Sequence, residues 1–129
     1  MTKFSSEITG FLTQVGANDA LRVGIVPKSD SCGDPGDIVF FRYKLGSGKG
    51  SRGTRILLIT EPVTKDAKTG NLLLTGFKVP PGGSYTPESL ETLYSNSELP
   101  REGYRTYIMS NIFGPLRRIS KVPPDELEQ

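Results

Sequence analysis

Apolar residues recur at helical spacing near the beginning of the chain. Their intervals of four, three, one and three residues place Phe4, Ile8, Phe11, Leu12 and Val15 on a single stripe. This stripe predicts an amphipathic helix over residues 4–16, which Gly16 is suited to end. The helix either covers one end of a sheet or docks into a groove of a partner through Phe4, Ile8 and Phe11.

Farther along, short runs of aliphatic, β-branched and aromatic residues alternate with turn residues. These runs predict strands at residues 21–26, 38–45, 54–61, 71–79, 104–109 and 116–120. Gly70 and Asn71 suit the return of a hairpin, and residues 110–114 suit a tight or single 3₁₀ turn. The strands are close in sequence and their connections are short, which favours a bent antiparallel sheet that closes on itself.

A second, shorter helix is predicted at residues 87–95, within an insertion at 86–95. Thr86 is a good N-cap, Pro87 is favoured at the first helical position, and Glu88 complements the helix dipole. The predicted fold is mainly β (α+β): a small SH3-like or Sm-like antiparallel barrel with an N-terminal amphipathic helix and this inserted helix. We expect one domain over residues 1–129, with the barrel at 21–120 and an acidic tail at 121–129.

Five segments of the predicted strands form a recognisable series: Val39-Phe40-Phe41-Arg42-Tyr43, Thr54-Arg55-Ile56, Gly70 to Phe77, Tyr104-Arg105-Thr106-Tyr107 and Ile112. Together they resemble the WYL-type β-barrel. The resemblance spans about residues 38–120, and Leu72-Leu73-Leu74 stands where that family has its tryptophan-tyrosine-leucine triplet. The resemblance implies an SH3-like fold. It also implies a ligand-binding role in charged residues on the barrel surface, for which Arg55 and Arg105 would be the carriers.

Charge is distributed unevenly along the chain, although its net value is only +2. Residues 38–60 contain five basic residues and no acidic one, whereas the last residues are acidic. Such a division can form a basic face that binds a polyanion or an acidic protein surface. The candidate residues for that face are Arg42, Lys44, Lys49, Arg52, Arg55 and Arg105.

The glycine-rich segment 46–53 lies between two predicted strands. It fails the P-loop pattern because Tyr43 stands where the first glycine belongs and Gly50 follows Lys49, and because it leads into a strand rather than a helix. Two interpretations stay open for this segment. It is either a flexible hairpin tip or a cationic arm that becomes ordered on a phosphate backbone or an acidic surface.

The acidic loop at residues 29–37 invites a calcium interpretation, but Pro35 and Phe41 occupy positions where an EF-hand loop starting at Asp30 needs glycine and glutamate. Turn chemistry explains this loop better, and we expect Cys32 to be an exposed thiol within it. The chain contains no histidine and one cysteine, which excludes imidazole-based triads and mixed histidine–cysteine zinc sites. We therefore expect no enzyme, no cofactor and no metal site.

Four aromatic residues on predicted strands have two interpretations. They either pack in the core or stack on nucleic-acid bases beside the arginines; the four are Tyr43, Phe77, Tyr104 and Tyr107.

We expect a non-enzymatic interaction module, a small structural or assembly protein of a larger complex such as a phage-like virion or tail. The alternative is a WYL-like or SH3-like nucleic-acid-binding regulator. The chain has no apolar run long enough for a membrane span, and its first residues do not have the pattern of a secretory leader. We therefore expect it in a cytoplasm, or in a virion if it is viral.

Overall fold

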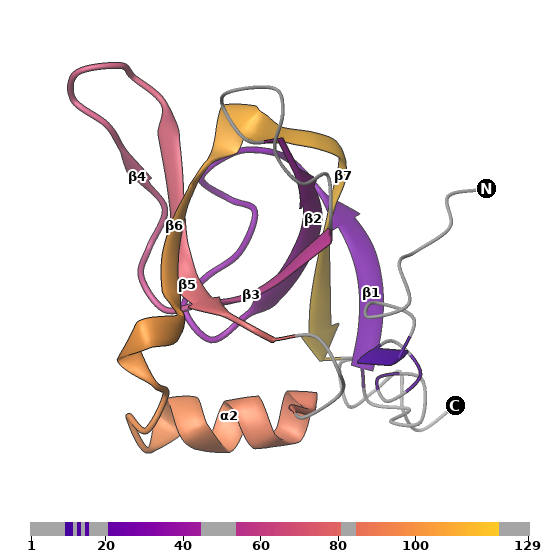
Figure 1. Ribbon diagram of the computed structural model, residues 1–129. Coiled ribbons are helices and arrows are strands. Elements are labelled where there is room, and N and C mark those ends of the chain that lie inside the picture. Colours follow the sequence, from indigo (N-terminus) through magenta and orange to yellow (C-terminus); the bar gives the residue numbers. More distant parts are fainter. Residues whose placement is uncertain are drawn as a thin grey trace.

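The computed structural model describes residues 10, 11, 13, 15, 21–44, 54–80 and 85–121 of the 129-residue chain. Within these residues the fold is mainly β, with one α-helix described along its whole length, α2 (Pro87–Ser95) (Figure 1). The strands are β1 (Leu21–Val26), β2 (Ile38–Tyr43), β3 (Thr54–Ile59), β4 (Thr64–Lys65), β5 (Leu72–Lys78), β6 (Tyr104–Ile108) and β7 (Ile112–Lys121). Two three-residue 3₁₀ helices, η1 (Arg101–Gly103) and η2 (Met109–Asn111), precede β6 and β7.

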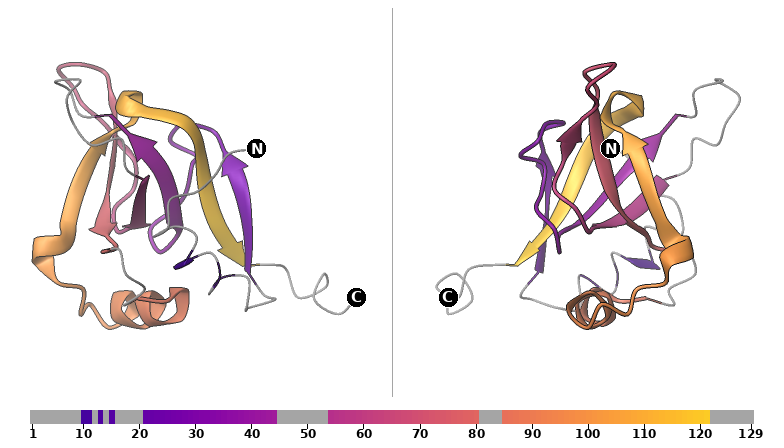
Figure 2. Two further views of the ribbon diagram at one scale, coloured as in Figure 1. Left: turned by 45° about the vertical axis from the view of Figure 1, so that its right-hand side comes forward. Right: turned by 90° about the vertical axis from the view of Figure 1, so that its left-hand side faces the viewer.

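All seven strands belong to one antiparallel sheet with the order β1-β7-β2-β3-β5-β4, and β6 pairs with the other side of β5. The sheet is strongly curved, and η2 carries the chain from β6 directly to β7 (Figures 1 and 2). Two hydrogen bonds join the end of β2 to this connection. Lys44 N donates to Asn111 O at 3.0 Å, and Ile108 N donates to the Tyr43 hydroxyl at 3.1 Å. The arrangement is compatible with a small barrel-like fold.

Strands β2 and β3 are buried on both faces of the sheet. Ile38 and Phe40 pack in one hydrophobic cluster, whereas the alternating residues Val39 and Phe41 pack in a second. This two-sided burial explains why β2 is nearly continuously apolar in sequence, because a strand with one solvated face would alternate with polar residues.

Helix α2 covers the first cluster, where its Leu90 is fully buried. The helix begins with a reciprocal capping box. Ser89 N donates to Thr86 Oγ1 at 3.0 Å, and Thr86 N donates to Ser89 Oγ at 2.8 Å. The helix has the predicted bounds because its start signals are local and strong.

The N-terminal stripe contributes two described side chains to the same cluster. Phe11 and Val15 have helical backbone and are each only 3% exposed. Their burial favours the covering role over the docking role for this part of the stripe. Phe4 and Ile8, the other two docking candidates beside Phe11, lie outside the described residues.

The second cluster contains three aromatic rings from β2 and β6. The Tyr107 ring meets those of Phe41 and Tyr43 edge to face, with centroids 5.2 and 4.8 Å apart. Phe77 is buried in the first cluster, so three of the four candidate stacking aromatics are core residues. Only Tyr104, at 40% exposure, faces outward among those four.

The last strand begins earlier than predicted, at Ile112 rather than at residue 116. Gly114 and Pro115 have turn composition, yet β7 continues through them. Pairing of β7 with β2 is irregular between Phe40 and Arg42, and Gly114 has a φ of 71°. A bulge of this kind accommodates glycine within a strand.

The two-residue strand β4 was also not predicted, because its side chains are exposed and polar.

Candidate anion-binding surface

Three basic side chains from adjacent strands share one face of the sheet. In the strand registers, Lys78 of β5 lies opposite Leu57 of β3, and Arg105 of β6 lies opposite Gly76 of β5. Side chains two residues apart on a strand point to the same face. Arg55, two residues before Leu57, therefore joins Lys78 and Arg105, and we name these three residues the basic cluster.

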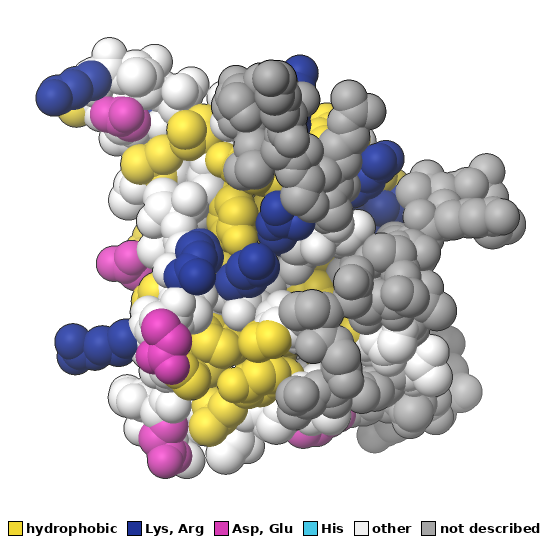
Figure 3. Space-filling model, in the orientation of Figure 1, with side chains coloured by type: hydrophobic (Ala, Val, Ile, Leu, Met, Phe, Trp, Pro, Cys, Tyr) yellow, Lys and Arg dark blue, Asp and Glu magenta, His cyan; other side chains and the backbone are white. Residues whose placement is uncertain are grey.

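The basic cluster lies on the side of the sheet that carries the second hydrophobic cluster. Leu57 and Tyr107, which belong to that core, are two residues from Arg55 and Arg105 respectively. Figure 3 shows Lys and Arg side chains gathered across the middle of this view, above an area of exposed hydrophobic side chains.

The ammonium group of Lys78 is in an unfavourable environment. Partial burial lowers its pKa, and the positive charges of Arg55 and Arg105 lower that pKa further. Among the described residues, no carboxylate is one of the groups that act on the pKa of Lys78. An anion bound at the basic cluster would therefore offset the like-charge repulsion and favour the charged form of Lys78.

Tyr107 links the basic cluster to the core. Burial raises the pKa of its hydroxyl, while Arg55 and Arg105 oppose that rise and Arg55 hydrogen-bonds to the hydroxyl. Tyr107 is therefore a neutral phenol that holds Arg55 in place. Arg105 is oriented by its own turn, because its Nη1 donates to Glu102 O and Tyr104 O at 2.6 and 2.8 Å. Both arginines are thus positioned before any partner arrives.

The other predicted basic residues do not join this cluster. Arg42 is exposed and points away from its buried neighbours Phe41 and Tyr43, with its guanidinium carbon 4.7 Å from the centre of the Phe113 ring. Lys44 is exposed just beyond β2. Lys49 and Arg52 of the glycine-rich segment lie outside the described residues, so both interpretations of that segment stay open.

The sequence prediction missed Lys78. It is a single lysine near the end of an apolar strand, and only the register of β5 with its neighbours brings it next to Arg55 and Arg105. Alternation along one strand shows which face a residue occupies, but it does not identify the residues on the adjacent strands.

The prediction of an exposed Cys32 was wrong. Cys32 is fully buried in the second hydrophobic cluster, and burial raises the pKa of its thiol. The surrounding loop is rich in turn residues, and its tip is a turn as predicted: Asp37 N donates to Asp34 O at 2.9 Å, and Asp34 N donates to Asp37 Oδ2 at 2.8 Å. The same loop is tied to the end of β3, because Gly36 N donates to Ile59 O at 2.7 Å and Ile59 N donates to Asp37 O at 2.9 Å.

The described residues contain no group of three or more His, Cys, Asp or Glu side chains placed to hold a metal ion. In the same part of the chain, no helix combines the length and the apolar character that crossing a membrane requires.

Comparison with protein-family models and with curated proteins finds no match for this chain. The resemblance to WYL-type barrels therefore stays a prediction from the sequence.

Proposed function

We propose that this chain is a non-enzymatic interaction module of a larger protein assembly, such as a phage-like virion or tail, and that its basic cluster binds an acidic surface of a partner. The observation that carries the proposal is the convergence of Arg55, Lys78 and Arg105 from three adjacent strands. On this proposal the chain works in the cytoplasm, or in the virion if it is viral.

The proposal includes an SH3-like or Sm-like barrel as the scaffold. Two features support closure of the sheet: the short η2 connection from β6 to β7, and the hydrogen bond from Ile108 N to the Tyr43 hydroxyl. Closure would give the basic cluster a rigid support, because strands in a closed sheet have fewer free edges at which to move or pair.

The basic cluster contains a charge, that of Lys78, which is unfavourable in the unbound protein. Partly buried like charges cost free energy in the unbound protein, and a positioned carboxylate turns that cost into attraction. The two arginines suit bidentate contacts with carboxylates, since a guanidinium presents its donors in a planar fork.

Nucleic-acid binding is the alternative function, and the same three cations favour it. Proteins usually bind single-stranded nucleic acid through aromatic side chains that stack on the bases, as well as through cations. Tyr43, Phe77 and Tyr107 are buried, which leaves Tyr104 as the exposed member of the four candidates. We therefore favour an acidic protein partner.

The experiment is affinity capture with the full chain from the cells that produce it, followed by mass spectrometry. We expect wild type to retain members of a large particle, and Arg105→Gln to retain several-fold less of them. The matched control Arg42→Gln removes an arginine outside the cluster and should behave as wild type. Equal capture by all three proteins would refute the role of the cluster, and finding only free monomer would refute the assembly proposal.

A filter-binding titration with single-stranded and duplex oligonucleotides separates the two functions. Binding at low salt that weakens steeply as salt is added, and that Arg105→Gln reduces, would favour the nucleic-acid alternative. We expect no such binding.

A further inference from the structure

Strand β1 lies at one edge of the sheet, at the right-hand side of Figure 1. From Leu21 to Val26 it pairs with β7 in an unbroken antiparallel register. No other strand of the described residues pairs with β1, so its far side is the end of the sheet. A strand in this place directs alternate backbone N–H and C=O groups outward, where another strand can pair with them.

Strand β6 forms the opposite edge, and contacts inside the fold occupy part of it. Ile108 N donates to the Tyr43 hydroxyl at 3.1 Å, and the Tyr107 ring packs against that of Tyr43. Edge strands are commonly protected by proline, lysine or a bulge. Residues 21–26 contain no proline or lysine, and their register with β7 has no irregularity. Strand β1 is therefore the edge that suits pairing with another chain.

Two positions of β1 fit a strand that another chain covers. Ile25 is 70% exposed, although it is a large aliphatic residue within a strand. Gly24 has neither a bulge nor a positive φ, and a side chain placed there would meet no atom of the described residues within 4 Å. Glycine weakens a strand and often marks a place where another backbone approaches closely.

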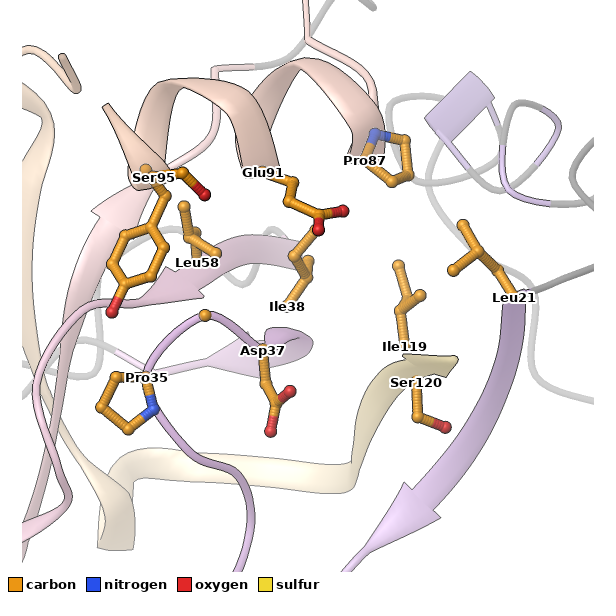
Figure 4. A pocket seen from close by; sticks show the side chains of 12 residues that line it. Leu21, Pro35, Asp37, Ile38, Leu58, Pro87, Glu91, Ser95, Ile119 and Ser120 are labelled. Atoms are coloured by element: carbon orange, nitrogen blue, oxygen red, sulfur yellow. The ribbon is translucent and has the colours of Figure 1, made fainter. Parts of the chain in front are cut away.

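The apolar side chains of β1 form one row that runs from the core to solvent. Leu21 and Val23 pack against the first hydrophobic cluster. Figure 4 shows the Leu21 side chain near Ile119, where both line a cavity of about 450 Å³ beneath α2. Ile25 continues this face of the strand, two residues beyond Val23. A second strand beside β1 would therefore extend the apolar face outward and cover Ile25.

Antiparallel geometry restricts how β1 can pair with a second copy of itself. Two residues that lie opposite each other must both direct their backbone groups toward the partner strand or both away from it. The two-fold axis of a symmetric pair therefore passes between two identical residues. A centre at Val23 or at Gly24 pairs the most residues of this six-residue strand. Of these two registers, the one about Val23 places Ile25 beside Leu21 of the second copy.

We infer that β1 pairs with β1 of a second copy of this chain, antiparallel about Val23, and forms a two-fold dimer. The Ile25 side chain of each copy then contacts Leu21 of the other, and Val23 lies opposite Val23. Such aliphatic cross-strand pairs stabilise a sheet. Arg22 lies beside Gly24 of the second copy, which leaves space there, so the two arginines do not oppose each other. One register thus accounts for both Ile25 and Gly24.

Sedimentation velocity of the full chain between about 10 μM and about 1 mM tests the dimer. Ile25→Lys places a charge on the pairing edge, whereas Tyr104→Lys changes the other large exposed hydrophobic residue, on β6. We expect wild type and Tyr104→Lys to shift from monomer to dimer, and Ile25→Lys to associate about tenfold more weakly or less. Wild type that stays monomeric, or equal association by all three proteins, would overturn the inference.

Two further measurements identify the edge and the register. In wild type, higher concentration should slow hydrogen exchange at every second amide of residues 21–25; no change there would overturn the inference, even if Ile25→Lys failed to fold. In a Cys32→Ser background, Val23→Cys should form an intermolecular disulfide on mild oxidation. Gly24→Cys should not, because pairing about Val23 sets its two copies too far apart. Cross-linking by Gly24→Cys alone would refute the register.

The outcome is separable from that of the proposed function, because β1 contains no residue of the basic cluster. A dimer together with unchanged capture by Arg105→Gln would keep this inference and refute the role of the basic cluster. A monomer together with reduced capture by Arg105→Gln would refute the dimer alone.

Discussion

Tyr43 and Tyr107 pack edge to face across the interior, with ring centroids 4.8 Å apart and an interplanar angle of 76°. The Tyr43 hydroxyl also accepts the N–H of Ile108, the residue after Tyr107. One side chain of β2 therefore contacts both the core and the backbone of β6, although β2 and β6 do not pair in the sheet. This contact brings the two strands together and supports the curvature of the fold.

The first prediction concerns this hydrogen bond. Tyr43→Phe keeps the ring packing but leaves the partly buried Ile108 N–H without its acceptor. We expect the free energy of unfolding to fall by about 1–3 kcal/mol, measured by urea denaturation. Tyr104→Phe, at an exposed position, is the control and should change it by less than about 0.5 kcal/mol. A loss for Tyr43→Phe no larger than the control's would show that the hydroxyl is unimportant.

The second prediction concerns Thr60, whose Oγ1 is buried and has no hydrogen-bond partner within the described part of the chain. Thr60→Val replaces the hydroxyl with a methyl group of similar size and removes an unsatisfied polar atom. We expect the free energy of unfolding to rise by about 1 kcal/mol, measured by chemical denaturation. The control is Thr64→Val, at an exposed position of β4. If Thr60→Val destabilised the protein, a partner for this hydroxyl would have to exist in solution.

The third prediction follows from the buried thiol of Cys32. Its pKa in the folded protein lies above the ordinary value of 9.0, so the folded state retains the proton where the unfolded state has lost it. The stability that this group contributes is therefore complete below about pH 9 and is lost as the pH rises above that value. Between pH 8 and 10, wild type should lose more stability than Cys32→Ser, which has no thiol to titrate. Parallel pH profiles would contradict the burial of the thiol.

Local sequence signals predicted much of the fold. Strands β2 and β3 are marked by their own apolar runs, and helix α2 is marked by the capping residues at its start. Because each signal lies within the element or next to it, the positions of these three elements were predictable from the sequence. Cys32 was misplaced because polar turn residues surround it in sequence, while its burial depends on the distant strands that pack over it. Local composition does not report such tertiary packing.

The candidate sites were less predictable than the fold. Arg55 and Arg105 could be proposed from charge distribution and resemblance, whereas Lys78 required the pairing of β5 with β3 and β6. The place of β1 at the edge of the sheet was not predicted either. Residues 21–26 were predicted as a strand, but their place in the sheet depends on the order in which distant segments pair.

The central claim is that Arg55, Lys78 and Arg105 form a site for an acidic partner, and Lys78 offers the most direct test. Lys78→Met removes a charge that burial and the neighbouring Arg55 and Arg105 disfavour, and keeps an unbranched apolar side chain. We therefore expect the variant to have a higher Tm than wild type at low salt, because like-charge repulsion at the cluster is reduced. Lys44→Met, at an exposed position outside the cluster, is the control.

The deciding measurement is the change in Tm that polyglutamate causes at low salt in wild type, Lys78→Met and Lys44→Met. A ligand that binds the folded state raises Tm. We predict a clear rise for wild type and Lys44→Met, reversed by added salt, and little or no rise for Lys78→Met. An equal rise in all three proteins, or none in wild type, would contradict the basic cluster as the binding site.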